Sequence, residues 1–275
     1  MVALRTRKRL KQKNPNEKIL RPVHPNAGIT AAYRRKLDAL IEEMANSISY
    51  WLEASYKANE PLAQDELPAS ALKAAIRKLT ARWQKRFDAA APKLAEYFAT
   101  AVEKRSSTAL RNILKEAGIS IEFSMTPAQR DILQATIQAN VELIKSIPAQ
   151  YLTQVQGSVM RSVQTGRDLG TLAKELQDHY GVTKRRAAFI SRSQNNLATA
   201  SMTRARQVEL GITEAIWMHS GGGKHPRHSH LKAGKDKTKY DTSKGWLDPE
   251  VGKLIFPGEL PNCRCVSRSV VKGFS

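Results

Sequence analysis

Residues 217–234 read Trp-Met-His-Ser-Gly-Gly-Gly-Lys-His-Pro-Arg-His-Ser-His-Leu-Lys-Ala-Gly, and residues 254–266 read Leu-Ile-Phe-Pro-Gly-Glu-Leu-Pro-Asn-Cys-Arg-Cys-Val. Four of the six histidines and both cysteines lie between residues 217 and 271, namely His219, His225, His228, His230, Cys263 and Cys265. The many Gly, Pro and polar residues here predict short strands joined by long loops. Such a region buries little apolar surface, so we expect something beyond a large core to fix its shape.

The residues before 217 show the apolar spacing of helices. A helix is predicted to begin near Thr30, because apolar residues recur every three or four positions; they are Tyr33, Leu37, Leu40, Ile41, Met44, Ile48, Trp51 and Leu52. We expect Pro92 to kink or restart the next helix and Pro148 to end a third. A short helix ending at Gly181 and a long one from Thr183 to Gly211 should follow, and alternation over residues 119–123 predicts a short strand.

These elements predict a mainly α fold with a small C-terminal α+β unit, in which a helical N-terminal region precedes a loop-rich domain with short strands. We expect a basic N-terminal arm at residues 1–26, a helical domain at 27–125, and a C-terminal domain at 126–275 whose loop-rich terminal unit is 217–271. The arm carries eight basic residues and one acidic residue, a net of +7. It is either a solvated arm or a segment that orders on DNA or on an acidic partner.

The formal net charge of +20 predicts partners rather than a fold. It favours phosphate backbones or acidic protein surfaces. The chain has no apolar run of about 18 residues that would span a membrane, and its N-terminus lacks the apolar segment of a secretory signal, so we expect no membrane to be needed for folding. Two cysteines one residue apart do not make a disulfide framework, which favours folding in a reducing cytoplasm.

Two groups of basic residues are the candidates for binding DNA or a partner. The first lies in the arm and comprises Arg5, Arg7, Lys8, Arg9, Lys11 and Lys13. The second begins the last predicted helix and comprises Lys184, Arg185 and Arg186, for which the alternative interpretation is a solvated face. Arg192, on the same helix, is expected to tie it to the terminal unit through a carboxylate or backbone carbonyls.

Several residues form a pattern that resembles the head-morphogenesis domain of tailed bacteriophages, the family of the phage Mu F protein. The pattern comprises Trp217, Arg227, His230, Gly234, Asn262, Cys263, Arg264 and Cys265. The resemblance covers residues 130–271 and includes Arg192, Arg204 and Gly211 upstream. The family usually has Arg-Thr-Glu where this chain has Arg192-Ser193-Gln194, so the role of that acidic residue is in question here.

The resemblance implies a minor head protein of a tailed phage. Such a protein associates with the portal protein during procapsid assembly, lies inside the capsid near the portal vertex, and affects packaging or ejection of the genome. The implied partners are the portal protein and the double-stranded DNA genome, with the major capsid or scaffolding protein as further candidates. The implied location is the virion, after assembly in the host cytoplasm, and no enzyme activity is expected.

Two features can hold the terminal unit together. One is a structural zinc ion bound by His230, Cys263 and Cys265, with His228 or His225 as the fourth ligand; without a cofactor, the cysteines would pack as small apolar residues and His230 would bond a carbonyl. The other is docking on the last helix through Arg192 and the apolar side of Trp217. We expect docking, because Cys-x-Cys spacing is unusual for structural zinc.

The alternative function is a metal-dependent nuclease or a toxin-like enzyme acting on nucleic acid. Histidine-rich loops followed by cysteines suit such chemistry, but a nuclease also needs carboxylates on its metal. Asp236, Asp241 and Asp248 lie near in sequence, and no motif places them together. Cleavage of plasmid DNA distinguishes the two functions.

Overall fold

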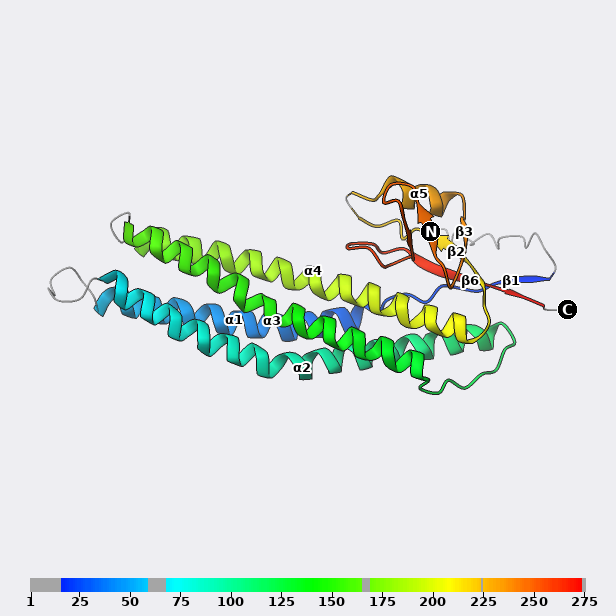
Figure 1. Cartoon of the computed structure of the whole chain (residues 1–275), viewed down its shortest axis with the longest axis horizontal. Helices are drawn as coiled ribbons and strands as arrows, with labels where there is room; N and C mark the ends of the chain where they lie inside the picture. Colours follow the sequence, from blue (N-terminus) through cyan, green and yellow to red (C-terminus); the bar gives the residue numbers. More distant parts are fainter. Residues whose placement is uncertain (1–15, 59–67, 165–168, 224, 274–275) are drawn as a thin grey trace, which may run out of the picture. The chain divides into compact units, whose positions relative to one another are not determined.

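The computed structural model describes residues 16–58, 68–164, 169–223 and 225–273. Over these residues the elements follow in the order β1 (Glu17–Ile19), α1 (Ala27–Ala58), α2 (Pro68–Glu116), α3 (Pro127–Gln164), α4 (Leu169–Glu209), β2 (Glu214–Met218), α5 (His228–Lys235), β3 (Lys239–Asp241), β4 (Trp246–Asp248), β5 (Lys253–Ile255) and β6 (Val266–Lys272) (Figure 1). The predicted fold class is confirmed: the chain is mainly helical, and its short antiparallel strands lie mostly near the C-terminus. Within the described ranges, no helix combines the length and apolar character needed to cross a membrane.

Two compact units interleave along the sequence. The helical unit comprises residues 25–104 and 130–198, and the sheet unit comprises residues 1–24, 105–129 and 199–275. Helices α2, α3 and α4 each contribute part of their length to both units. The predicted domains are instead continuous stretches with boundaries at residues 26 and 126, and these boundaries stay a prediction.

The core of the helical unit is built from the apolar stripe predicted for α1. Six of its members are buried, namely Tyr33, Leu37, Ile41, Met44, Ile48 and Leu52. Tyr33 stacks on Phe98 of α2 with ring centroids 4.4 Å apart, and its hydroxyl donates to Oδ1 of Asn140 on α3 at 3.0 Å. Trp51 was expected in the stripe but is 48% exposed, because it lies at the edge of the buried face.

The helices are longer than the sequence predicts. Helix α2 runs through Pro92, and α3 runs through Pro148 to Gln164 without the predicted stop. Helix α4 continues past Gly181, where the sequence predicts two separate helices. Buried residues flank these positions, including Ala91, Ala95, Ile147 and Tyr151. Their packing outweighs the local preference of proline and glycine to end a helix.

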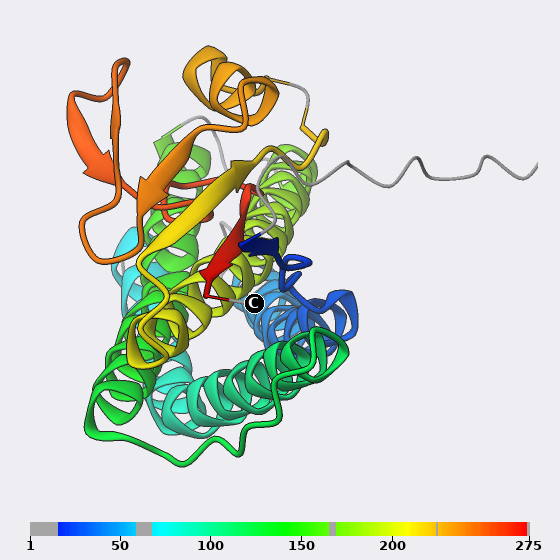
Figure 2. The ribbon, with the colours of Figure 1, turned by 90° about the vertical axis from the view of Figure 1, so that its right-hand side faces the viewer.

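The sheet unit contains a four-stranded antiparallel sheet in the order β1-β6-β2-β3. Figure 2 shows the red β6 between the dark blue β1 and the yellow β2. In the central pair, Trp217 of β2 is in register with Ser267 of β6. Strands β4 and β5 form a separate two-stranded ribbon in which Leu247 pairs with Leu254.

Part of the predicted basic arm belongs to this sheet, because Glu17–Ile19 form strand β1 within the chain itself. Lys18 of β1 is in register with Val271 of β6, and its ammonium group donates to the carbonyl of Ala117. Arg21 forms an ion pair with Glu116 at the end of α2. The binding candidates Arg5, Arg7, Lys8, Arg9, Lys11 and Lys13 lie outside the described residues.

The strand predicted over residues 119–123 is not formed. Its alternating residues Ile119, Ile121 and Phe123 instead pack as an extended segment against a buried cluster of Leu20, Val23, Leu110, Leu114 and Ala117. The alternation of apolar and polar residues therefore indicates a segment with one buried face. An extended segment can have such a face without pairing to a neighbouring strand.

Candidate functional site

Helix α5 and strand β2 position the residues of the candidate site. Trp217 of β2 is fully buried, and its ring meets the ring of His230 edge-on, with centroids 4.8 Å apart. His230 lies in the first turn of α5, whose N-terminal Ser229 N–H donates to a carboxylate oxygen of Glu250 at 2.7 Å. That carboxylate satisfies an otherwise unpaired N–H group of the helix and fixes where α5 begins.

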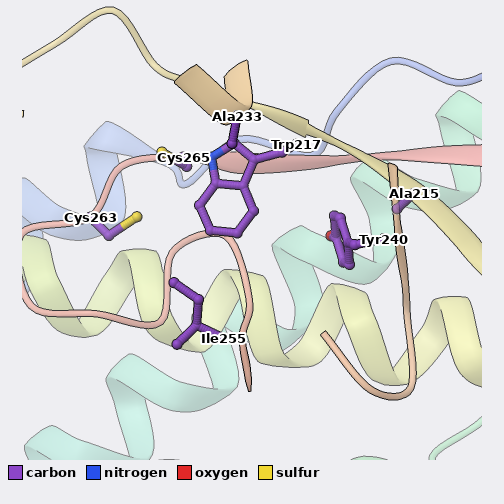
Figure 3. Close-up of a cluster of buried hydrophobic side chains, with 7 residues drawn as sticks. All are labelled: Ala215, Trp217, Ala233, Tyr240, Ile255, Cys263 and Cys265. Carbon is purple, nitrogen blue, oxygen red and sulfur yellow. The ribbon is translucent and has the colours of Figure 1, made fainter. Parts of the chain in front are cut away.

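Both cysteines converge on one nitrogen atom of His230. The Nδ1 atom lies 3.5 Å from Sγ of Cys263 and 3.7 Å from Sγ of Cys265. All three residues are buried, and their potential ligand atoms lie within 4.8 Å of one another. Figure 3 shows the two cysteine side chains beside the indole of Trp217. The structure thus brings together the three residues that the sequence offered as candidate metal ligands.

Asp248 determines which nitrogen of His230 carries a proton. Oδ2 of Asp248 lies 3.1 Å from Nε2 of His230, and a carboxylate only accepts hydrogen bonds. The proton is therefore assigned to Nε2, which leaves the Nδ1 lone pair directed at the sulfur atoms. Asp248 is itself held by the hydroxyl of Ser229 at 3.2 Å and the N–H of Glu250 at 2.8 Å.

Three N–H groups face the sulfur atoms. The N–H of Gly258 donates to Sγ of Cys263 at 3.3 Å, and the backbone N–H of Ser220 helps to lower the pKa of Cys265. The indole N–H of Trp217 has no partner of ordinary hydrogen-bond geometry, but it is turned toward the Cys265 sulfur (Figure 3) and helps to lower the pKa of that thiol. These donors favour negatively charged sulfur.

The two thiols affect each other's ionisation. A hydrogen bond from Cys265, opposed by burial and aided by His230, lowers the pKa of Cys263. The same contact and burial raise the pKa of Cys265, because a second thiolate beside the first would be repelled. For Asp248, burial alone would raise the pKa, but the hydrogen bonds from Glu250 and Ser229 and the nearby His230 lower it.

Other residues of the family pattern shape the backbone around this cluster. Gly234 has no room for a side chain, because a Cβ atom there would lie 2.5 Å from Cβ of His219. Asn262 adopts a φ of 62°, a left-handed conformation that Asn tolerates better than most residues. Arg227 donates from its guanidinium to the carbonyl of Pro261 at 3.2 and 3.3 Å, which anchors the chain just before Cys263.

A cavity of about 400 Å³ opens beside the cluster. Its lining includes His230, both cysteines, His219, His225 and the exposed Arg264. His225 and His228 were the predicted fourth ligands. The described lining contains His225 but not His228, which is exposed at the start of α5.

The basic candidates on α4 differ in their surroundings. Arg185 is exposed, and Lys184 lies over the ring of Tyr180 at 5.2 Å. Arg186 donates to the carbonyl and hydroxyl of Ser146 at 3.2 and 2.9 Å, so it joins α4 to α3 within the helical unit. Arg192 is exposed and belongs to the helical unit, and its predicted tie to the terminal region stays a prediction.

The sheet packs on the end of α4, which belongs to the same unit, through residues that the sequence did not single out for this role. Buried Gln207 donates to the hydroxyls of Ser267 and Ser269 on β6 at 3.2 and 2.7 Å. The guanidinium of Arg204 lies 3.9 Å from the ring centroid of Phe256. The serines alternate along β6, which is the signal that could have identified one polar face of that strand.

The carboxylates considered for a nuclease do not share one role. Asp248 supports His230, whereas Asp241 accepts hydrogen bonds from Ser243 and Lys244 in a turn, and Asp236 ends α5. Sequence reasoning missed the link from Asp248 to His230. The Asp248-Pro249 pair signals a turn, but no local pattern predicts its long-range partner.

Comparisons with known proteins agree with the resemblance drawn from the sequence. Residues 153–268 match the family model described as Phage Mu protein F like protein. An uncharacterized protein of Haemophilus influenzae is 27% identical over 268 residues, which cover 95% of this chain and 58% of that relative. No solved structure matches the chain.

The matched range begins in α3 and ends in β6, so it contains the whole His230–Cys263–Cys265 cluster. The chain therefore carries a phage Mu F-like region, and the predicted family resemblance is confirmed over residues 153–268. The match points to phage head morphogenesis, and it begins later in the sequence than the predicted domain boundary at residue 126.

Proposed function

We propose that this protein is a minor capsid protein of a tailed bacteriophage. It associates with the portal protein inside the head, near the portal vertex, and acts in procapsid assembly and in packaging or ejection of the genome. The observation that carries this proposal is the Mu F-like match, which spans the C-terminal third of α3, all of α4 and the cluster of the sheet unit. Portal protein and DNA are the proposed partners, with the major capsid or scaffolding protein as further ones.

The charge of the chain supports contact with DNA. A net charge of +20 suits a compartment filled with phosphate groups. Exposed Arg185 and half-buried Lys184 lie on one part of α4, and the arm residues Arg5, Arg7, Lys8, Arg9, Lys11 and Lys13 add further charge. We propose that these residues contact phosphates without selecting a base sequence, because phosphate contacts carry no sequence information.

Mass spectrometry of purified virions beside emptied heads tests the location. We expect the protein in full virions and in procapsids purified with their portal, and co-purification with the portal protein alone when the two are co-expressed. Its absence from all particles, or particles of normal composition and infectivity without it, would contradict the proposed role.

A metal-dependent nuclease or toxin-like enzyme is the second candidate, favoured by the cavity that opens directly beside two cysteines and a histidine. Zinc sites with catalytic roles keep one coordination position open in this way. Incubation of the full chain with plasmid DNA and divalent metal separates the candidates. Cleavage that is lost in His230→Ala but kept in His228→Ala would favour the enzyme, and intact plasmid together with portal binding would favour the head protein.

A further inference from the structure

We propose that His230, Cys263 and Cys265 bind a zinc ion that fastens helix α5 to the segment preceding β6. The three side chains come from two places in the chain, the first turn of α5 and the loop before β6. An ion between them would link these segments inside a region that otherwise has a small apolar core. This inference rests on the geometry of the sheet unit and does not depend on the role of the protein in the head.

The spacing of the potential ligand atoms fits a tetrahedral ion. With ordinary zinc–nitrogen and zinc–sulfur bond lengths, a tetrahedral zinc ion separates its nitrogen and sulfur ligands by about 3.6 Å. The observed separations from Nδ1 of His230 are 3.5 Å to Cys263 and 3.7 Å to Cys265. The distance from His230 to each cysteine therefore already matches that of two ligands on one ion, and the three atoms lie within 4.8 Å of one another.

The surroundings of His230 prepare it to act as a ligand. Because Asp248 accepts a hydrogen bond from the Nε2–H group, the Nδ1 lone pair faces the sulfur atoms instead of solvent. A carboxylate on the far nitrogen of a histidine is the usual support of a zinc ligand, since it fixes the ring and makes the ligand nitrogen more basic. Asp248 is fully buried, so its carboxylate hydrogen-bonds to His230 instead of to water.

The sulfur atoms are surrounded as thiolate ligands would be. Both sulfur atoms face the single lone pair on Nδ1 of His230. Only one of the two thiols can therefore donate a hydrogen bond to that nitrogen at a time. The N–H of Gly258 is directed at Cys263, and the indole N–H of Trp217, fully buried and without an ordinary partner, is turned toward Cys265 (Figure 3). Donors of this kind stabilise charged sulfur, and a cation between the sulfurs would remove their mutual repulsion.

The donor set selects the ion, and the cavity supplies its remaining ligand. Two thiolates and an imidazole favour zinc over magnesium, calcium or manganese, which prefer oxygen ligands. All three ligands line the cavity of about 400 Å³, which lets water or an imidazole from its lining occupy the fourth position. Binding releases the proton of each thiol that is protonated beforehand, and no bond of the chain is broken.

The first test uses the full-length protein purified without added chelator. Native mass spectrometry and elemental analysis should find one zinc per chain, and removal of zinc by a strong chelator should lower the thermal unfolding temperature, with recovery after zinc is added back. Replacement of zinc by cobalt should give the visible absorption of tetrahedral thiolate coordination. A chain that binds no zinc at micromolar concentration, or whose unfolding ignores both chelator and added zinc, would overturn the proposal.

Variants locate the ion. His230→Ala and Cys265→Ser should abolish stoichiometric zinc, whereas His228→Ala, two residues away on α5, should retain it. Asp248→Asn keeps the ligands and should weaken zinc affinity by about 10- to 100-fold, measured by competition with a chromogenic chelator. Full zinc occupancy in His230→Ala would contradict the assigned ligands. If a ligand variant does not fold, the wild-type chelation and cobalt measurements still decide the question.

Discussion

At position 234 the absence of a side chain lets α5 lie close to His219, the residue that follows β2. A Cβ atom there would lie 2.5 Å from Cβ and 2.9 Å from the backbone nitrogen of His219, so the backbone itself would have to move. Mid-helix Gly181 is different: its added Cβ would be 3.5 Å from the flexible end of Arg185. The glycine-to-alanine substitution can therefore be compared at a position without room for a Cβ atom, Gly234, and at one with room, Gly181.

We expect Gly234→Ala to lower the free energy of unfolding by about 1–3 kcal/mol, the usual range for overpacking in a close-packed site. Gly181→Ala should raise it by about 0.4–1 kcal/mol, because alanine restricts the unfolded chain and suits a helix. Urea unfolding followed by circular dichroism measures both. Equal effects of the two variants would show that close approach at residue 234 is not what requires glycine.

The sequence predicted much of the candidate site at the level of single residues. His230, Cys263 and Cys265 were singled out together, and the structure places them within 4.8 Å of one another. It could not choose between His225 and His228 as a further ligand, because that depends on how the loop before α5 turns. Nor could it pair Asp248 with His230, since the contact joins residues of different elements and leaves no local pattern.

Between elements, the end of α4 is fastened to β6 by one buried amide. Gln207 is 1% exposed, and its amide nitrogen donates to the hydroxyls of both Ser267 and Ser269. Ser267 also accepts from the hydroxyl of Tyr240 at 2.7 Å, so this contact continues into β3. When one partner of a buried hydrogen bond is removed, the other is left unsatisfied. The loss of stability is then larger than the net contribution of the hydrogen bond itself.

A double-mutant cycle measures this contact. Gln207→Ala, which removes a side chain hydrogen-bonded to Ser269, should destabilise the protein by about 1–3 kcal/mol. The cycle with Ser269→Ala should give a coupling energy of about 0.5–3 kcal/mol, as for residues in direct contact. Gln138 and Glu142, an exposed pair on α3 with an N–O distance of 3.1 Å, are the matched control. Their coupling should be about 0.2–0.5 kcal/mol, and similar values for both pairs would argue against a buried fastening.

The helices were predictable where the apolar periodicity extends over many residues. They were less predictable where packing against other helices decides where a helix ends. Six members of the α1 stripe are buried as expected. The stops expected at Pro148 and Gly181 did not occur, because local preferences compete with burial of the same helices against their neighbours. Strand β1 could not be foreseen from its own residues, since its pairing with β6 joins distant parts of the chain.

At the scale of the whole chain, the basic arm has two parts that deletions can separate. Lys18 and Arg21 are used inside the sheet unit, in contacts with Ala117 and Glu116. The charged residues before position 15 are the ones we propose for DNA or portal contact. A deletion that ends before β1 therefore removes the proposed binding residues and keeps the strand.

We expect deletion of residues 1–15 to weaken DNA binding and incorporation into heads. For duplex DNA, the slope of log affinity against log salt should be about −0.9 per phosphate contacted, and the deletion should make it shallower. Deletion of residues 1–21 removes β1 as well and should also lower the unfolding temperature. Salt-independent binding, or a 1–15 deletion that enters heads normally, would contradict the proposed role of the arm.

The pairing of β1 with β6 also has a consequence for the order of events on the ribosome. The helical unit has all its residues once Ala198 has been synthesised, whereas β1 waits for β6, which emerges far later. Until β6 has been made, the backbone of β1 has no strand with which to form hydrogen bonds, and β2 lacks one of its two neighbouring strands. Synthesis thus favours completion of the helices before the sheet, and the Cys-His segment is joined to the sheet only after β6 has been made.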